Sequence, residues 1–519
     1  MIAPYDTKCG PLVSVLVPTF NRRRYLREAL ESLVRQTHAH FEAFVVNDGG
    51  EPVADLVASF NDPRLVMLDR RENRGKAASL NEALQHARGK YVAYLDDDDR
   101  YYPRHLAALI EALESQDNCQ AAYTDLYKVH CRIEPDGSRQ VLGKVVNISR
   151  DFDRFFLCHF NHVLHVSLAH RRDLLDRTGL YNENLRVLID WDMTRRLAFF
   201  TDFLHLPEVT GEFYGPEGAC DRISYRMRLD KVEYLKQVLT IRTARPAKPW
   251  PKMPDLSLIY LPDTMDAAAG ETLRHIWLWT FMPYEVYLPL PPRQISRLDT
   301  DMPALVPVHV PDGTTRAARL NAALARATGD YVAVVTPSVR VQEMWVENAL
   351  YAATRDAEGK TAYALAPAED GWTALVVRRD VLASARAARP NASLRESLEA
   401  AGISLRGPDP TQLPFQFDEL LQNTQALEAE GAWLLAARSY AEIGRRYGNQ
   451  RWMRERAAAA YFHDGAHNED ALSICRELNA TQPTVSTVLL EAKLLKGAGK
   501  FDEALALLNQ AEAILSSER

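Results

Sequence analysis

Short apolar runs alternate with amphipathic segments along the first 245 residues of the chain. Val13–Val17 and Phe41–Val46 are rich in apolar and β-branched residues and are typical of buried strands. Tyr25–Arg35, between them, has apolar side chains at helical spacing. The alternation continues through two more apolar runs and one helical segment, at Leu65–Leu68, Tyr91–Leu95 and Ser79–Ala87. Strands that alternate with helices predict an α/β domain with a largely parallel sheet.

Part of this pattern is repeated later in the chain. Residues 79–84 and 89–95 reappear as 319–324 and 329–335, at a constant shift of 240 positions. Where the first copy continues with Asp96-Asp97-Asp98, the second has Thr336-Pro337-Ser338. The sequence therefore predicts two copies of one scaffold, and the acids belong to the chemistry of the first copy, since the second does without them.

Two proline-containing stretches divide the chain. Residues 246–254 are rich in proline and predict a stiff linker, and a second such stretch ends near residue 410. We therefore expect domains at 1–245, 255–410 and 411–519. In the last one, Ala437, Ala471 and Ala504 recur at spacings of 34 and 33 residues. This resembles tetratricopeptide repeats, and an ordinary helical bundle is the alternative.

Net charge, cysteine content and the length of apolar runs exclude several classes of protein. The net charge of −7 over 519 residues argues against a dedicated nucleic-acid binder. Six widely spaced cysteines without a C-x-x-C pair predict reduced thiols and not a disulfide frame or a zinc site. No run approaches the ~20 apolar residues of a membrane span, and the N-terminus does not read as a signal peptide. The expected location is the cytoplasm, with peripheral attachment to the inner membrane left open.

Four consecutive carboxylates, Asp96 to Asp99, follow the apolar run Tyr91–Leu95. Carboxylates this close repel one another unless a cation neutralises them. In open α/β sheets, ligands bind at this end of the strands, and hard divalent cations there hold substrate phosphates. A solvated acidic turn is the alternative, and the residues by themselves leave both interpretations open.

Five motifs in order carry a resemblance to a known family, over about 230 residues. The first domain resembles family 2 glycosyltransferases, which have the GT-A fold. The second resembles a degenerate, non-catalytic copy. The motifs of the first domain are Val13-Ser14-Val15-Leu16-Val17-Pro18-Thr19-Phe20-Asn21, Val45-Val46-Asn47-Asp48-Gly49-Gly50, Asn73-Arg74-Gly75-Lys76, Leu95-Asp96-Asp97-Asp98-Asp99 and Ile189-Asp190-Trp191-Asp192.

The resemblance implies a donor site for a nucleotide-diphosphate sugar with Mn²⁺ or Mg²⁺. Asp98 is then the metal ligand, and Asp96 or Asp97 contacts the ribose or metal-bound water. Because four acids are consecutive, the register is open by one position, and Asp99 stays a candidate ligand.

Residues of the other motifs complete the implied donor pocket. Asp48 matches the aspartate that accepts a hydrogen bond from the base, which favours uridine or thymidine donors because cytosine has no hydrogen at N3. A plain turn at Asn47–Gly50 is the alternative. The implied pocket also includes residues after the first strand and a cation for the diphosphate, namely Pro18, Thr19, Asn21 and either Lys76 or Arg74.

The family's catalytic base matches Asp190, in an inverting mechanism. Family members often have glutamate just before it, where this chain has Ile189. Asp192 is expected to cap or support the helix that begins here. The histidines between His159 and His170 suggest a metal cluster at first sight. Since Val163–Leu168 resembles a strand, we expect one or two of them to line the acceptor cleft instead.

The leading hypothesis is a metal-dependent, inverting glycosyltransferase that acts on a hydroxyl of a glycan, a lipid carrier or a protein. The C-terminal repeats are expected to offer a surface for a protein partner. A non-catalytic sugar- or protein-binding scaffold is one alternative. A sugar-phosphate nucleotidyltransferase is another, but it would need a glycine-rich basic loop where the chain has Pro18-Thr19-Phe20-Asn21.

Overall fold

The computed structural model describes most of the chain, in two compact units. One unit comprises Met1–Asp153, Asn161–Val238 and Phe417–Arg519, and the other comprises Arg154–Phe160 and Leu239–Gln416. The described residues are 10–146, 149–216, 230–296, 304–336, 345–364, 367–368, 371–372, 374–407, 421, 424–425, 427–428, 431–446 and 451–517.

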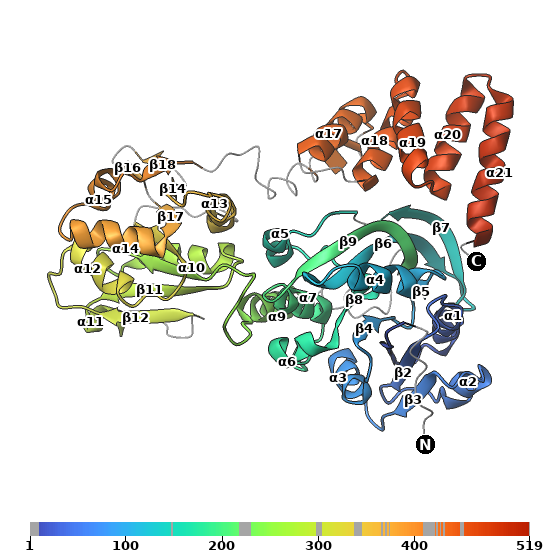
Figure 1. Ribbon diagram of the computed structural model, residues 1–519, viewed down its shortest axis with the longest axis horizontal. Helices are drawn as coiled ribbons and strands as arrows, with labels where there is room; N and C mark the ends of the chain where they lie inside the picture. Colours follow the sequence, from blue (N-terminus) through green and yellow to red (C-terminus); the bar gives the residue numbers. More distant parts are fainter. Residues whose placement is uncertain are drawn as a thin grey trace. The chain divides into compact units, whose positions relative to one another are not determined.

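The first unit is built on a nine-stranded sheet (Figure 1). Its strand order is β3-β2-β1-β4-β8-β6-β9-β5, and β7 pairs with β6. Strands β1 to β4 are parallel to their neighbours among themselves, and β8 then runs antiparallel to β4. The strands are β1 (Val13–Thr19), β2 (Phe41–Asn47), β3 (Leu65–Asp69), β4 (Tyr91–Tyr94), β5 (Arg100–Tyr101), β6 (Cys119–Ile133), β7 (Arg139–Val146), β8 (Leu168–Arg171) and β9 (Asp202–Pro216).

Helices with apolar faces, such as α1, pack against this sheet. Leu26, Leu30 and Leu33 of α1 are fully buried and pack into one core with side chains of α2, α4 and the sheet. The strands and helices predicted between Val13 and Leu95 are confirmed, with ends that differ by a few residues. The helices of this unit are α1 (Arg23–Val34), α2 (Ala54–Ser59), α3 (Lys76–His86), α4 (His105–Glu114), α6 (Leu175–Thr178) and α7 (Ile189–Leu197). Helix α5 (Arg154–His159) belongs to the other unit, and α9 (Lys231–Thr243) begins in the first unit and ends in the second.

The connections of the sheet define where a ligand would bind. From β1 the chain goes to β2 on one side, and it later returns to β4 on the other side. Such a reversal opens a crevice at the carboxyl ends of the central strands. Thr19 ends β1, Asp48 directly follows β2, and the four aspartates follow β4. Three of the sequence motifs therefore meet at this crevice.

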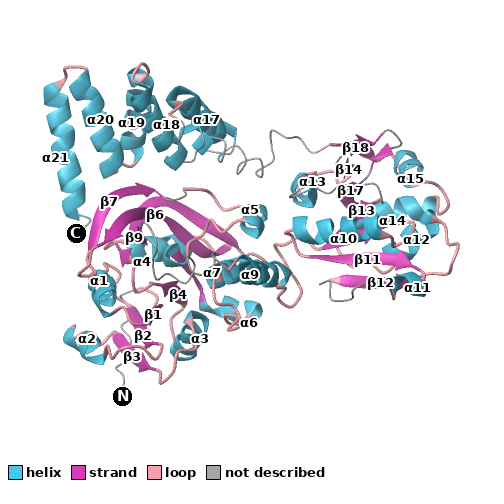
Figure 2. Ribbon diagram, turned by 180° about the vertical axis from the view of Figure 1, so that it is seen from behind, coloured by secondary structure: helices cyan, strands magenta, loops and turns pink. Residues whose placement is uncertain are grey.

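The second unit has a seven-stranded sheet in the order β12-β11-β10-β13-β17-β14-β18 (Figure 2). Its strands are β10 (Leu256–Tyr260), β11 (Tyr284–Leu290), β12 (Leu305–His309), β13 (Tyr331–Val335), β14 (Thr361–Ala364), β17 (Ala374–Arg378) and β18 (Ser404–Arg406), besides a small hairpin of β15 (Pro367–Ala368) and β16 (Gly371–Trp372). Its helices are α10 (Ala267–Trp279), α11 (Pro292–Ile295), α12 (Arg316–Leu324), α13 (Trp345–Ala353), α14 (Arg379–Ala388) and α15 (Leu394–Ala400).

The two sheets repeat one another in register. In the first, Val13 pairs with both Phe41 and Tyr91. In the second, Leu256 pairs with both Tyr284 and Tyr331, and Tyr331 is the residue that the sequence repeat matches to Tyr91. Residues 337 and 338, where the second copy departs from the acidic sequence, lie outside the described residues.

A buried serine–glycine contact occurs in both copies. The backbone N–H of Gly89 donates to Ser14 Oγ at 2.9 Å, and Gly329 donates to Ser257 Oγ at the same distance. A Cβ at Gly89 would lie 2.5 Å from the backbone nitrogen of Ser14, which is closer than real side chains come. Glycine is required here because two strands' backbones approach each other closely.

We expect Gly89→Ala to lower the free energy of unfolding by about 1–3 kcal/mol, because the added methyl group must push backbone atoms apart. Urea unfolding of the full chain measures this. The matched control is Gly143→Ala on β7, where an added Cβ meets nothing within 4 Å. Equal stability of the two variants would contradict the close-contact interpretation.

The C-terminal segment consists of consecutively packed helices. Ala437, Ala471 and Ala504, which define the sequence period, are all buried. The helices are α17 (Trp433–Arg446), α18 (Arg451–Asp464), α19 (Asn468–Thr481), α20 (Val485–Gly497) and α21 (Phe501–Ser517). Small side chains on the buried faces allow close approach between neighbouring helices.

One predicted strand is wrong. Val163–Leu168 does not form a strand; residues His165–Ser167 form a single 3₁₀ turn, and β8 begins only at Leu168. The turn is stabilised by two contacts of His165. Its ring stacks on Tyr94 with the ring centroids 3.9 Å apart, and its Nε2 is hydrogen-bonded to the Tyr181 hydroxyl at 2.8 Å. These long-range contacts override the local alternation of apolar residues.

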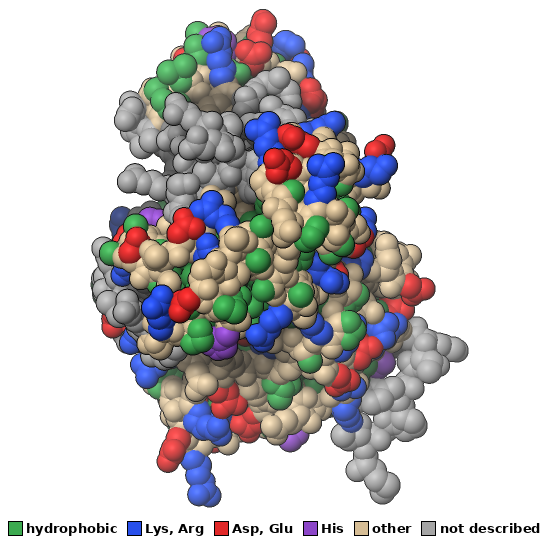
Figure 3. Space-filling view, turned by 90° about the vertical axis from the view of Figure 1, so that its left-hand side faces the viewer, with side chains coloured by type: hydrophobic (Ala, Val, Ile, Leu, Met, Phe, Trp, Pro, Cys, Tyr) green, Lys and Arg blue, Asp and Glu red, His purple; other side chains and the backbone are tan. Residues whose placement is uncertain are grey.

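Two observations bear on the surface. Within the described part of the chain, no helix has the length and apolarity needed to cross a bilayer. On the face drawn in Figure 3, acidic and basic side chains are interspersed, without a field of one sign among the side chains shown.

Candidate functional site

The four aspartates form a tight turn at the end of β4. The backbone N–H of Asp99 donates to the carbonyl of Asp96 at 3.1 Å, which closes the turn. The turn is also held from outside. Arg139 of β7 donates to the Asp98 carbonyl at 2.7 Å, and the N–H of Tyr214 donates to Asp99 Oδ1 at 3.2 Å. Strand β7 therefore holds the backbone of the turn and β9 holds the Asp99 side chain, while the side chains of Asp96 and Asp98 are at the crevice.

Three of the carboxylates converge and one is turned away. Asp96, Asp98 and Asp99 each offer an oxygen atom, and these oxygens lie within 4.8 Å of one another. An all-oxygen donor set of this kind suits Mg²⁺ or Mn²⁺. Asp97 instead accepts a hydrogen bond from Thr19 at 2.8 Å in the interior. Burial raises the pKa of Asp97 to about 7, and the charge of Asp98 adds to this rise.

Protein cations face the acidic turn. Lys76, the first residue of α3, lies 2.6 Å from Asp96. Arg22 lies 2.8 Å from Asp98 and 3.4 Å from Asp97. Burial works against the charge of Lys76, but the neighbouring carboxylate Asp96 outweighs it and the pKa of Lys76 is raised. Lys76 is therefore a charged lysine at the crevice, paired with Asp96.

Asp190 lies in the first turn of α7, as the sequence predicts. Its Oδ2 accepts a hydrogen bond from Asn161 Nδ2 at 2.9 Å. Desolvation raises the pKa of Asp190, against the lowering effect of the positive charge on Lys76. The pKa of Lys76 is itself raised by both Asp96 and Asp190. The same ammonium group therefore links the acidic turn to Asp190, although nearly 100 residues separate the two in the sequence.

Asp192 has a different environment from Asp190. It is buried and forms an ion pair with Arg196 at 2.6 Å, one turn further along α7. Arg196 also donates to the carbonyl groups of Thr178 and Gly179. Asp192 therefore anchors the helix against the preceding segment, while Asp190 is half-buried at the site.

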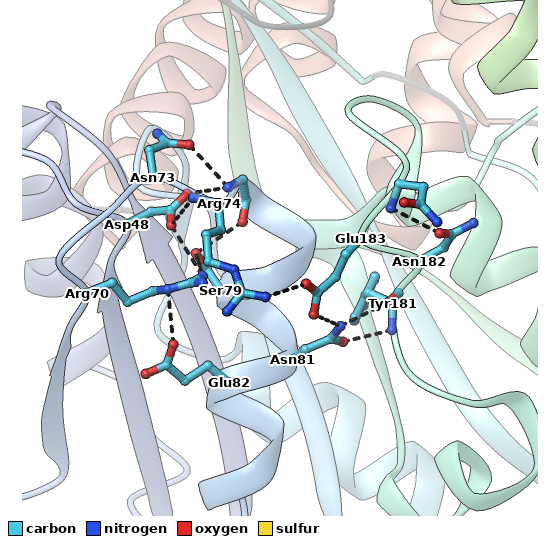
Figure 4. A network of polar contacts seen from close by, with 12 residues as sticks. Asp48, Arg70, Asn73, Arg74, Ser79, Asn81, Glu82, Tyr181, Asn182 and Glu183 are labelled. Atoms are coloured by element: carbon cyan, nitrogen blue, oxygen red, sulfur yellow. Dashed lines mark hydrogen bonds and ion pairs between the residues drawn. The ribbon is translucent and has the colours of Figure 1, made fainter.

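Asp48 accepts hydrogen bonds from a loop that it holds in place. The backbone N–H groups of Arg74 and Gly75 donate to its two oxygens at 3.0 and 2.7 Å, and Arg70 lies 3.3 Å away (Figure 4). Arg70 also pairs with Glu82 of α3. A carboxylate has about four lone-pair sites, so Asp48 can accept one further donor. In the second copy the residue after the corresponding strand is Pro291, which has no such carboxylate.

Figure 4 also shows a second arm of this network, which reaches the segment before α7. Arg74 pairs with Glu183 at 3.0 Å, and Asn81 donates to Glu183 and to the carbonyl of Tyr181. The Asn81 oxygen also accepts from the N–H of Tyr181 at 2.8 Å. The loop beside Asp48 and the segment leading to Asp190 are therefore tied together.

Of the remaining predicted residues, only Asn21 lies after β1; Pro18 and Thr19, expected after the first strand, are its last two residues because they still pair with β2. Pro18 pairs with Val46 inside the sheet. Asn21 has a positive φ of 55°, and its side-chain oxygen accepts from the N–H of Glu51 at 2.7 Å. Asparagine tolerates this left-handed conformation better than most residues do. A Cβ at Gly50 would lie 2.8 Å from the Asn21 nitrogen, so a glycine is needed opposite this turn.

The sequence predictions did not include several residues of the site. Arg22, Asn161, Glu183 and Arg139 each contact a candidate residue or its backbone. Arg22 directly follows a motif and could have been found as a basic residue beside an acidic crevice. Asn161, Glu183 and Arg139 lie in irregular segments or on an edge strand, and nothing in the local pattern distinguishes them.

The comparisons with known proteins agree with this geometry. Residues 14–171 match the family model described as Glycosyl transferase family 2. These residues form a family 2 glycosyltransferase domain. The matched range contains the crevice residues from Pro18 to Asp99, whereas Asp190 lies beyond its end.

Several curated relatives carry glycosyltransferase names. "Uncharacterized glycosyltransferase RP339" from Rickettsia prowazekii is 31% identical over 36% of this chain and 58% of its own length. "Uncharacterized glycosyltransferase YwdF" from Bacillus subtilis is 28% identical over 36% of this chain and 68% of its own length. The chain thus spans less than two thirds of the former.

Among solved structures, S. aureus TarS 1-349 in complex with UDP-GlcNAc is similar at 21% identity and a TM-score of 0.33. The match covers 44% of this chain and 70% of that one.

Proposed function

We propose that the chain is a metal-dependent, inverting glycosyltransferase. It transfers a sugar from a nucleoside-diphosphate donor to a hydroxyl group of a glycan, a lipid carrier or a protein. One observation carries the proposal. Within a family 2 domain, the carboxylates of Asp96, Asp98 and Asp99 converge at the end of β4, with Lys76 2.6 Å from Asp96 and Asp190 in the first turn of α7. A diphosphate-binding group and a candidate base therefore serve one crevice.

The acidic turn would hold the donor's diphosphate. Asp98 and Asp96 offer oxygen ligands to Mn²⁺ or Mg²⁺, with Asp99 as a third, and a bound ion would supply Lewis-acid stabilisation of the leaving group. Lys76 places a second positive charge beside Asp96, where negative charge develops as the sugar–phosphate bond breaks. Thr19 keeps Asp97 in the interior and so fixes the direction in which its neighbours point.

Asp190 would act as the general base. As the acceptor oxygen forms its bond to the anomeric carbon, the bond to the diphosphate breaks, and the hydroxyl proton passes to an Asp190 oxygen. Burial raises the pKa of Asp190 towards neutrality, which suits a base at physiological pH. Asn161 orients this carboxylate by a hydrogen bond to Oδ2.

The nucleotide preference rests on Asp48. With two backbone N–H groups and Arg70 already at its oxygens, it can offer its last lone-pair site to a base with an N–H donor. Uracil and thymine carry a hydrogen at N3, whereas cytosine does not. Uridine or thymidine diphosphate sugars are therefore the proposed donors, with Pro18, Thr19 and Asn21 in the wall of the same pocket.

The remaining parts are assigned supporting roles. The domain that contains the second sheet is proposed to be non-catalytic, since Pro291 stands where the first copy has Asp48. The C-terminal helices are proposed to be tetratricopeptide-like and to bind a protein partner or an acceptor. The proposed location is the cytoplasm.

A donor panel tests the function. The full chain is incubated with UDP-, dTDP-, GDP- and CDP-sugars, with Mn²⁺, Mg²⁺ or EDTA, and free nucleoside diphosphate is measured. We expect slow, metal-dependent release of UDP or dTDP with an intact diphosphate. Release of pyrophosphate in the presence of nucleoside triphosphate and sugar phosphate would show a nucleotidyltransferase instead. Binding without any turnover would favour the scaffold.

A further inference from the structure

We propose that Arg22 is a built-in counter-cation of the acidic turn, which competes with the divalent cation for Asp98 and then binds the donor's diphosphate. The inference rests on the metal site proposed above. It makes Arg22 a residue that couples metal binding to nucleotide binding.

The chain reversal after β1 directs Arg22 towards the acidic turn. Asn21, with its positive φ, reverses the chain directly after β1, and Arg22 is the residue before the first turn of α1. Its guanidinium reaches back over the crevice to Asp98 Oδ2 at 2.8 Å and Asp97 Oδ1 at 3.4 Å. Its side chain is only 20% exposed, and that of Asp98 only 14%, so solvent screens this pair weakly.

The contact concerns the carboxylate that the metal needs. Asp98 Oδ2 accepts a charge-assisted hydrogen bond from Arg22, which occupies one lone-pair site and offsets the negative charge that would attract a cation. A divalent cation beside a guanidinium is also repelled by it. Metal binding at Asp98 therefore weakens the Arg22–Asp98 pair, and the pair in turn weakens metal binding.

A guanidinium that is displaced from Asp98 can bind a phosphate group instead. Its planar fork of N–H donors matches a phosphate group, and a metal-bound diphosphate brings such a group to the same crevice. Arg22 thus opposes the metal when the site holds no nucleotide and stabilises the diphosphate once metal has entered. By linkage, metal and nucleoside diphosphate must then favour each other's binding.

Arg23, the next residue, supplies a matched control. It has the same charge, but it pairs with Asp55 at 2.5 Å on an exposed part of α1 and α2. Arg23→Ala removes an equal charge from the same helix end without touching the acidic turn. A general electrostatic effect would appear in both variants, whereas the proposed competition appears only at Arg22.

The test measures two affinities in the full chain. Calorimetry and Mn²⁺ electron paramagnetic resonance give the Kd of Mn²⁺ without nucleotide, and UDP is then titrated at saturating Mn²⁺. We expect Arg22→Ala to tighten Mn²⁺ binding about tenfold and to weaken UDP binding about tenfold, which is ~1.4 kcal/mol in each direction. Arg22→Lys should fall between the wild type and Arg22→Ala in both measurements, and Arg23→Ala should match the wild type.

Opposite changes in the two affinities distinguish this role from a merely structural one, which would weaken both. Mn²⁺ binding that is unchanged or weaker in a folded Arg22→Ala protein overturns the inference. If the wild type binds Mn²⁺ and Asp98→Asn abolishes that binding, the proposed metal site stands even when the Arg22 inference fails. If no variant binds Mn²⁺, both proposals fall.

Discussion

Asp190→Asn is expected to reduce sugar transfer about 10³-fold while UDP still binds with wild-type affinity. Asparagine has nearly the same shape but cannot take a proton, and general-base catalysis contributes roughly 10²- to 10⁴-fold. Asn161 can still donate to the new amide's oxygen, so the local structure should survive. Steady-state transfer kinetics, together with calorimetry using UDP and Mn²⁺, separate the chemical step from binding.

The same prediction has a pH signature. A group whose pKa is raised by burial is protonated, and inactive as a base, at the acid end of the range. Wild-type kcat should therefore rise with pH through the raised pKa of Asp190, above the ordinary value of 3.8. The residual activity of Asp190→Asn should lack this rise.

Asp192→Asn is the matched control, two positions away on the same helix. This substitution leaves the charge of Arg196 buried without its ion-pair partner. Breaking such a pair typically lowers the free energy of unfolding by about 3–5 kcal/mol. We expect a clear fall in thermal stability there and little fall in Asp190→Asn. If Asp190→Asn instead lost UDP affinity, Asp190 would belong to the donor pocket and not to the acceptor side.

The elements that the sequence predicted well are those fixed by local pattern. β1, β2 and β4 are almost fully buried, so their sequences are continuous apolar runs with little ambiguity. The repeat at a shift of 240 positions was informative for the same reason, because it preserves both the apolar pattern and the glycine that packs on the central strand. Such features depend on neighbours within one or two elements.

The elements that the sequence could not predict depend on distant contacts. His165 lies in a 3₁₀ turn because of Tyr94 and Tyr181, which come from other parts of the chain. The split of the four aspartates into one interior residue and three converging ones depends on Thr19 and on the β7 and β9 strands. A run of four identical residues does not indicate which of them a distant side chain will contact.

These contacts rank the four aspartates of the acidic turn as candidate metal ligands. Asp97 is in the interior, Asp99 accepts from the backbone of Tyr214, and Asp96 pairs with Lys76. Asp98 pairs with Arg22, a flexible side chain, and it belongs to the converging oxygen group. It is the carboxylate that a metal ion can best engage.

Asp98→Asn should therefore lower metal-dependent donor hydrolysis about 10²- to 10³-fold, since a lost ligand weakens the Lewis acid that stabilises the departing diphosphate. The control is Asp55→Asn, which also removes a carboxylate paired with an arginine, but on the exposed surface. Hydrolysis measured across a range of Mn²⁺ concentrations distinguishes weaker metal binding, which high Mn²⁺ restores, from a lost chemical role. Equal, metal-dependent rates in a folded Asp98→Asn protein and the wild type would instead place the metal on Asp96 and Asp99, and the competition proposed for Arg22 would lose its target.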